Sequence, residues 1–418
     1  MNTYREKHWL LSVVRSGIQA GVNYPKTVLF AGFLLMALLI TGLGQLHKDT
    51  RADAFLEADN PALVYKNKVR EIFGLSDPLI VAIYDRSAEG IYRKQTLDLI
   101  GQLTDQLNAL PMINTARTIS LASENNISAS ADGMDVAPFY DLRTQHDAAL
   151  RQAIEDFPLY HGMLVSDDGA MSMIVLELYD DSQAETAYDA INKLLQQTQV
   201  PAGVELHVAG EGAVLGYLGH YIDHDASRLN PLAGLIITIM LIVAFRRLLP
   251  ALLGNLVIAA SVLMTLGFMA YCGVPFFVIT NAMPVILIGM AVADSIHIFS
   301  HYYEMQARHP DWSLQACIRE AVAVMAHPVT LTSLTTIAGF LGLYASSYMP
   351  PFEYFGLFTA FGVLVAWFYS LFVLPACITL LKPRVSQRWI RLEQNSQQDT
   401  FARLMTYLGG ICVRHPRA

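Results

Sequence analysis

The sequence predicts an α-helical membrane protein with six spans and a large α+β domain between the first two. Of the 418 residues, 53% are hydrophobic and 15% are charged, whereas about a quarter of a soluble domain is charged. Several apolar runs are long enough to cross a bilayer. One long polar stretch, residues 47–226, alternates between strand and helix patterns.

The first predicted span follows a mildly basic segment, residues 1–26. The apolar run at 28–46, within a predicted helix 27–46, is long enough for a bilayer. A cleaved signal peptide is the alternative interpretation. The run is longer than a usual signal-peptide core, and GLGQLHKD lacks a small-residue cleavage site, so a retained helix is favoured.

Residues 47–226 are predicted to form the α+β domain. Alternating β-rich runs predict strands, and helical spacing of apolar residues predicts helices. The strands are expected at 77–85, 113–121, 171–180 and 204–210, and the helices at 91–110, 145–157 and 182–198. SDDG (166–169) predicts a hairpin turn, and Ser182 with Glu185 predicts a capping box. The order β-α-β, insertion, β-α-β is the split βαβ, ferredoxin-like pattern.

Five further spans are expected in residues 229–381. The apolar segments lie at 232–245, 251–272, 276–301, 329–348 and 355–381. Residues 301–327 are polar and amphipathic, so they are expected to lie along the cytoplasmic membrane surface as one helix. Residues 382–418 are expected to be a cytoplasmic tail.

The charge pattern predicts the orientation. Residues 46–230 carry 28 acidic and 13 basic residues, although the whole chain has a net charge of only −8. Basic residues recur in the loops expected on one side of the membrane: Arg246, Arg247, Arg308, Arg319, Lys382, Arg384, Arg388, Arg391 and Arg403. The turns at 273–275 and 346–353 have no Lys or Arg. By the positive-inside rule both termini are cytoplasmic and the 47–226 domain lies outside.

A short similarity suggests an internal repeat. Tyr24-Pro25-Lys26 precedes the first span, and His415-Pro416-Arg417 stands near the end of the sequence. The tail is therefore expected to lead into a second repeat that this chain lacks. The other interpretation is a plain cytoplasmic tail.

Asp294 is the candidate functional residue. It stands inside the predicted span 276–301, where a carboxylate costs about 2.5–3.5 kcal/mol on insertion scales and by default marks function. Helical steps of three and four put Thr280, Leu287, Asp294, His297 and His301 on one face. We interpret this face as a proton or ion relay.

Other residues are candidates for supporting roles. Thr332, Thr335, Thr336 and Gly339 form a small, hydroxyl-bearing stripe, which we expect to pack against the Asp294 face, unless it serves helix packing alone. His297 is a candidate for tuning Asp294. A metal site at Asp294, His297 and His301 is a weaker alternative, as is zinc at His220, Asp223 and His224.

The arrangement resembles half of a resistance–nodulation–division (RND) transporter, with its porter-type domain, and is most similar to the MMPL-type predicted exporters. GMAVADSIHIF (289–299) and HPVTLTSLTTIAGFLGLYASSYMPPFEYFGLFTAFGVLVAWFYSLFVLPA (327–376) carry the resemblance. The five-helix block 229–381 also resembles a sterol-sensing domain. Many relatives carry Gly-x-x-x-Asp, whereas here Gly289 is followed by Ala293 and the acid is Asp294. One relay carboxylate is thus missing, which leaves the coupling stoichiometry open.

The resemblance implies a secondary-active exporter in a bacterial inner membrane, driven by the proton motive force. Its substrate would be a lipid or another hydrophobic compound, and its partners would be protons and either a second transporter half or further copies of the chain. A lipid-binding regulatory protein without pumping, and a protein-translocation accessory, are the alternatives. The sequence shows no Ser/His/Asp set, no phosphate loop and no basic nucleic-acid patch. We therefore expect no enzyme, cofactor, metal or nucleic-acid partner.

Overall fold

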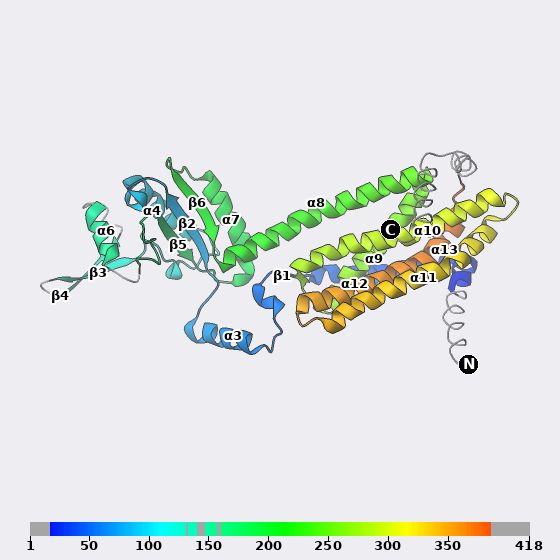
Figure 1. The fold of residues 1–418 in the computed structure, drawn as a ribbon, viewed down its shortest axis with the longest axis horizontal. Coiled ribbons are helices and arrows are strands. Elements are labelled where there is room, and N and C mark those ends of the chain that lie inside the picture. Colours follow the sequence, from blue (N-terminus) through cyan, green and yellow to red (C-terminus); the bar gives the residue numbers. More distant parts are fainter. Residues whose placement is uncertain (1–16, 131–132, 140–146, 157–159, 386–418) are drawn as a thin grey trace, which may run out of the picture. The chain divides into compact units, whose positions relative to one another are not determined.

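The computed structural model describes residues 17–130, 133–139, 147–156 and 160–385. The chain divides into two compact units. The helical unit comprises the described residues of 1–49, 54–57 and 225–418, and the α/β unit comprises those of 50–53 and 58–224 (Figure 1). The predicted tail, 382–418, lies outside the described residues from 386 onward, as does the His415-Pro416-Arg417 motif on which the expected repeat rests.

The helical unit confirms the prediction of six spans. Among the described residues, six helical segments are long and apolar enough to cross a membrane: Pro25–Gln45, Glu211–Phe245, Leu248–Tyr271, Val278–Arg308, Leu314–Ser346 and Pro350–Leu381. The helices that form them are α2 (Pro25–Ile40), α8 (Glu211–Phe245), α9 (Leu248–Tyr271), α10 (Met283–Arg308), α11 (Leu314–Ser346), α12 (Pro350–Phe368) and α13 (Leu374–Leu381). Short 3₁₀ turns extend α2 to Gln45 and begin the fourth segment before α10.

The prediction of one surface helix over 301–327 was wrong. Helix α10 continues to Arg308, and α11 begins at Leu314, with the Ser313 hydroxyl accepting from the Ala316 amide at 3.2 Å as an N-terminal cap. The apolar positions of this stretch, including Ile318 and Val322, belong to the buried core of the helical unit. The amphipathic pattern therefore reflects packing inside the bundle.

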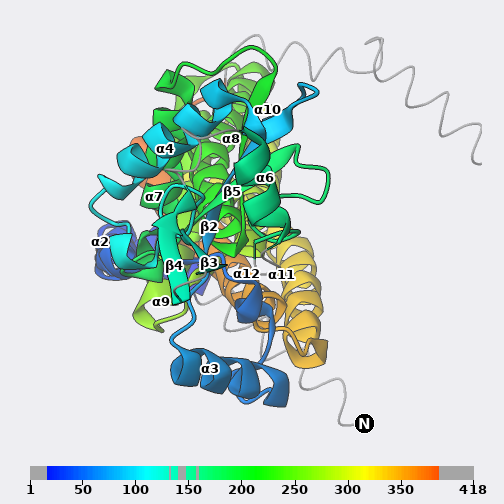
Figure 2. The ribbon, with the colours of Figure 1, turned by 90° about the vertical axis from the view of Figure 1, so that its left-hand side faces the viewer.

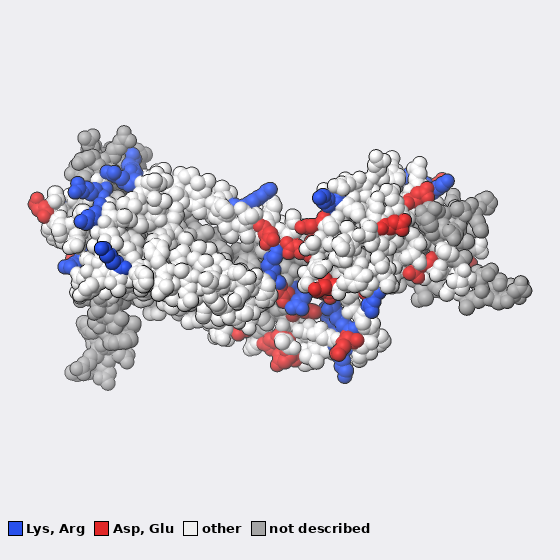
Figure 3. Space-filling view, turned by 180° about the vertical axis from the view of Figure 1, so that it is seen from behind, with Lys and Arg blue, Asp and Glu red and all other residues white. Residues whose placement is uncertain are grey.

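Basic residues gather at one end of the helical unit. Arg319 near the start of α11 donates to the Asn23 side chain at 2.6 Å, and the Tyr302 hydroxyl of α10 donates to the Pro383 carbonyl at 2.9 Å. The loop residues Arg246 and Lys382 follow helix ends that lie at this same end, where Figure 3 shows the blue Lys and Arg side chains together.

The opposite end of the bundle is held by a small strand pair. Strand β1 (Lys48–Asp49) runs parallel to β7 (Phe276–Phe277), which directly precedes the α10 segment. The Thr41 hydroxyl also hydrogen-bonds the Tyr271 hydroxyl at the end of α9. Close approach of α2 to α9 depends on Gly42 and Gly267, since a Cβ at either position would overlap a backbone carbonyl of the other helix.

The last span contains a π-helical turn, Tyr369–Val373, between α12 and α13. Pro375, the second residue after it, has no amide hydrogen for the helical ladder. The π turn widens the helix where that hydrogen bond is missing, and such turns are frequent at functional sites.

The α/β unit is built on a three-stranded antiparallel sheet. Strand β2 (Leu79–Asp85) lies between β5 (Met171–Leu176) and β6 (Val204–Ala209). Helices α4 (Lys94–Asn108) and α7 (Ala184–Gln197) pack into the same apolar core. The remaining elements are α3 (Pro61–Phe73), α6 (Asp147–Glu155) and a ribbon of β3 (Asn125–Ser130) with β4 (Gly133–Pro138), all visible in Figure 2.

Two local predictions for this unit were wrong. Residues 113–121 form no continuous strand, only isolated bridges from Ile113 to Leu178 and from Ile119 to Val175, because a 3₁₀ turn at Thr115–Arg117 interrupts them. Ser182 does not cap α7. Asp180 instead accepts from the Ser182 amide and begins a 3₁₀ turn before the helix. The complete four-stranded ferredoxin-like domain therefore remains a prediction.

Candidate functional site

Asp294 lies within α10, partly buried among apolar neighbours. The residues that flank it toward the core, such as Ala291, Ser295 and Ile298, are buried. The Ser333 side chain of α11 is near enough to act on its carboxyl as a hydrogen-bonding group. Ser333 is itself 3% exposed. The acid thus lies between two packed spanning helices with one hydroxyl group near it.

Among the described residues, no positive charge accompanies Asp294. Ser333 is the one side chain there that acts on its carboxyl, and no Lys, Arg or His forms an ion pair with it. Buried carboxylates in proteins are ordinarily paired with a cation or with several donors. This carboxyl is therefore well suited to change its protonation state and poorly suited to hold a fixed negative charge.

The threonine stripe does not supply the partner of Asp294. Thr332 and Thr335 are exposed within this chain, and Thr336 is partly buried. All three hydroxyls donate to backbone carbonyls of α11 itself, at 2.9–3.1 Å. The expected contact with Asp294 is made by Ser333, which the sequence analysis missed.

A signal for Ser333 was present in the sequence. The buried positions Val322, Ala326, Val329 and Ser333 follow one another at steps of four, three and four residues. This spacing marks the core-facing side of α11. Extending the apolar stripe by one step would have singled out the one hydroxyl on that side.

The histidines do not form a metal centre. His297 is exposed, whereas His301 Nδ1 lies 2.8 Å from Glu304 Oε2. His220 Nδ1 lies 3.2 Å from Asp189. Across the described residues, no three His, Cys, Asp or Glu side chains are gathered so that they could hold a metal ion. The two metal alternatives raised by the sequence therefore have no support in the geometry.

Next to Asp294, the helical unit presents an uncovered face of small and polar residues. On α10, Gly289, Ala293 and His297 recur every four residues and are all exposed. On α11, Thr332 and Thr335 are exposed, and Gly339 and Gly342 face open space. We name these residues of α10 and α11 the small-residue face. Asp294 adjoins it directly in the sequence.

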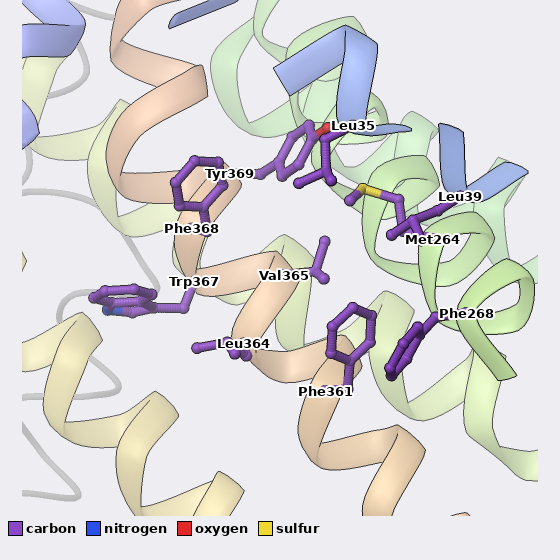
Figure 4. Close-up of a pocket in the computed structure, with 10 residues that line it drawn as sticks. All are labelled: Leu35, Leu39, Met264, Phe268, Phe361, Leu364, Val365, Trp367, Phe368 and Tyr369. Atoms are coloured by element: carbon purple, nitrogen blue, oxygen red, sulfur yellow. The ribbon is translucent and has the colours of Figure 1, made fainter. Parts of the chain in front are cut away.

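An apolar groove runs along α12. A cavity of about 430 Å³ lies between α2, α9 and α12 (Figure 4), and a second of about 540 Å³ adjoins it on the α11 side. Phe268 and Phe361 line both cavities, with ring centroids 4.5 Å apart. Tyr369, at the start of the π turn, lines the first cavity and donates its hydroxyl to the Gly32 carbonyl at 2.7 Å. The lining can accept hydrocarbon and offers almost no polar group.

Comparison with known proteins identifies the family. The MMPL family matches residues 92–418 of this sequence. The chain belongs to the MMPL family. The predicted resemblance to MMPL-type RND proteins is thereby confirmed.

Curated MMPL relatives are transport proteins. The chain is 26% identical over 262 residues to the probable transport protein MmpL4 of Mycobacterium leprae, a match covering 59% of this chain and 27% of that protein. It is 24% identical over 256 residues to the siderophore exporter MmpL5 of Mycobacterium tuberculosis, covering 58% and 26%. It is 33% identical over 133 residues to the hopanoid transporter HpnN of Rhodopseudomonas palustris, covering 32% and 15%. The matches thus span between about a seventh and a quarter of these relatives' length.

Proposed function

We propose that the chain is a unit of a proton-driven exporter of lipids or other hydrophobic compounds, and that Asp294 carries the proton. The observation that carries this proposal is the partly buried carboxyl that has, among the described residues, one hydroxyl group near it and no cation. A fixed charge in this position would be costly. Reversible protonation makes the residue useful, since the acid is then charged only when a proton pathway is open to it.

Ser333 supports this role because a hydroxyl can reverse its hydrogen bond. It donates to the ionised carboxylate and accepts from the protonated acid. The contact between α10 and α11 therefore persists in both states while its geometry changes. A helix displacement of this kind would couple proton transfer to the rest of the transporter.

The charge pattern supports an orientation in the membrane, from which we propose a direction of transport. The basic end of the helical unit is placed in the cytoplasm by the positive-inside rule. The α/β unit, inserted between the first two spans, is then on the outer side of a bacterial inner membrane. Protons moving inward through Asp294 would drive substrate outward.

The apolar groove along α12 supports a hydrophobic substrate. Its two cavities are lined by aromatic and aliphatic side chains within membrane-spanning helices. Two relatives are named as exporters or transporters of a siderophore and of hopanoids. A lipid or another compound with a long apolar part is the substrate class that fits both observations.

The small-residue face supports a further helical partner. Exposed glycines and threonines permit close approach of another helix inside a membrane. We propose that a second transporter half or a second copy of the chain covers this face and completes the surroundings of Asp294.

The test is gradient-driven movement of a fluorescent long-chain phospholipid across vesicles that contain the protein. Asp294→Asn keeps the size of the side chain and removes its titration. We expect it to abolish the response to an imposed pH gradient while membrane insertion is unchanged. Thr359→Val, at a residue whose hydroxyl bonds the Phe355 carbonyl of its own helix and which lies outside the small-residue face, is the matched control and should transport normally.

The same assay separates the regulatory alternative. A lipid-binding sensor would bind the phospholipid without any dependence on the pH gradient. Undiminished gradient-driven transport by Asp294→Asn would refute the relay, and lipid binding with no proton flux in the unmodified protein would favour the sensor.

A further inference from the structure

Helix α3, at the start of the α/β unit, is fully formed and yet buries none of its side chains. It begins with Pro61 after a cap in which the Asn60 side chain accepts from the Ala62 amide at 3.0 Å. It ends at Gly74, which takes the left-handed conformation (φ 62°) that favours glycine. Figures 1 and 2 both show it standing apart from the sheet of its unit.

One face of α3 is apolar and largely exposed, and only Val69 in it is partly buried. Tyr65, Val69, Ile72 and Phe73 follow the spacing i, i+4, i+7, i+8 that defines a helix face. Tyr65 is 71% exposed, Ile72 65% and Phe73 70%. Two bulky aromatic groups and an isoleucine on one side of a 13-residue helix are far from the usual scatter of single exposed apolar residues.

A different side of α3 attaches it to the α/β unit. The Lys66 ammonium lies 2.9 Å from Asp53 and 3.4 Å from Glu211, and the Arg70 guanidinium pairs with Asp77. Lys66 and Arg70 are four residues apart and lie on one side of the helix. The apolar face is therefore left free by the contacts that hold the helix in place.

Only a short stretch of chain separates α3 from the first membrane span. The first span ends at Gln45, and β1 then pairs with β7 at the end of the bundle opposite the basic residues. Residues 54–57 still belong to the helical unit, and α3 begins four residues later, at Pro61. Four extended residues reach at most about 14 Å.

The composition of α3 and its position in the chain together indicate that lipid covers its apolar face. A helix with aromatic and aliphatic residues on one side and Lys and Arg on the other suits the boundary between lipid headgroups and acyl chains. Lys68 is exposed beside the apolar face, where it would meet lipid phosphates. A helix of 13 residues is also marginal without packing of its apolar side.

We propose that α3 is an interfacial helix that lies on the outer surface of the same bilayer, with Tyr65, Val69, Ile72 and Phe73 inserted among the lipids. It anchors the first part of the α/β unit to the membrane beside the first span. This inference is independent of Asp294 and of any transport activity.

The test uses the full chain in lipid nanodiscs that contain phosphatidylglycerol and phosphatidylcholine. Single cysteines at Tyr65 or Ile72 carry a nitroxide, in a background whose four native cysteines are replaced. Asn67→Cys, on the opposite side of the helix and exposed, is the matched control. We expect labels at 65 and 72 to collide more often with oxygen than with a water-soluble nickel complex, and the label at 67 to show the reverse.

Two results would overturn the proposal. Equal access of the nickel complex to all three labels would place α3 in water. Labels at 65 and 72 that are immobilised and shielded from both oxygen and nickel would mean that protein, from a second copy or another subunit, covers the face. Because the three positions are exposed, the labels do not disturb the core of the unit.

Discussion

Two carboxylates, Asp85 in the α/β unit and Asp294 in the helical unit, are buried in opposite ways. Asp85 is 0% exposed and accepts from the Thr96 hydroxyl at 2.5 Å and the Ser87 amide at 2.9 Å, with the Arg93 guanidinium at 3.1 Å. Asp294 has a single hydroxyl partner. The charge of Asp85 is therefore compensated by several neighbouring groups, whereas the carboxyl of Asp294 has one polar neighbour among the spanning helices.

The difference distinguishes an acid that stabilises the fold from one that is suited to change its protonation state. Burial alone would raise the pKa of Asp85, but the hydrogen bonds from Thr96 and Ser87 and the nearby Arg93 hold it below its ordinary value. Asp85 thus stays ionised and fastens the end of β2 to the start of α4. Asp294 has no comparable set of donors, so its surroundings do not fix one charge state.

The comparison predicts a large loss of stability when Asp85 is removed. Asp85→Ala leaves the Arg93 charge and the Thr96 hydroxyl without their partner. Breaking a buried pair in this way costs about 3–5 kcal/mol. Hydrogen exchange of the β2 amides in the full protein should show that fall in opening free energy, and a change below about 1 kcal/mol would mean that Asp85 does not stabilise the sheet.

A smaller effect is expected from Thr96→Val, which keeps the shape of the side chain and removes one donor. Hydrogen bonds to charged groups contribute about 1.5–3 kcal/mol. Exchange at β2 should therefore accelerate less than in Asp85→Ala. Thr198→Val is the control, because its hydroxyl bonds only the Leu194 carbonyl of its own helix. Equal effects of the two threonine variants would deny Thr96 a special role.

The sequence predicted the membrane part of this contrast better than the soluble part. Six apolar runs and an acid inside one of them are direct signals, because a bilayer imposes length and apolarity on every span. Asp294 could therefore be singled out from the sequence alone. Its partner Ser333 could not be chosen with the same ease, because four hydroxyl residues lie close together in TSLTT (332–336).

Asp85 was missed for a physical reason. It ends a strand and precedes a loop, a position where an acid is usually solvated. Only the fold shows that Arg93 and Thr96 turn back onto it from the next helix. The strand expected at 113–121 failed in a similar way, since a local 3₁₀ turn at Thr115–Arg117 prevailed over the β-rich composition.

The pH dependence of the α/β unit should also reveal Asp85. Because the pKa of Asp85 is lowered in the folded state from an ordinary 3.8, its contribution is fully present above pH 3.8. It is lost as the pH falls through the lowered value. Below pH 4, the opening free energy of the β2 amides in the unmodified protein should fall by up to about 1.4 kcal/mol per unit of pKa difference. Asp85→Asn should show a flatter profile, and an identical profile would assign the acid sensitivity to other groups.

The smallest change in stability is expected at Asp294, and its sign is the sharpest test of the comparison. Asp294→Leu removes a carboxyl with one partner and adds an apolar group between packed helices. A side chain that serves function rather than folding should be replaceable there without loss of stability. The free energy of unfolding of the helical unit, followed by thermal unfolding, should therefore rise or change by no more than about 0.5 kcal/mol. Ser333→Ala should likewise be mild. A loss of several kcal/mol in Asp294→Leu would place Asp294 in the same class as Asp85, as an acid retained for structure, and the proton-carrying role would lose its physical basis.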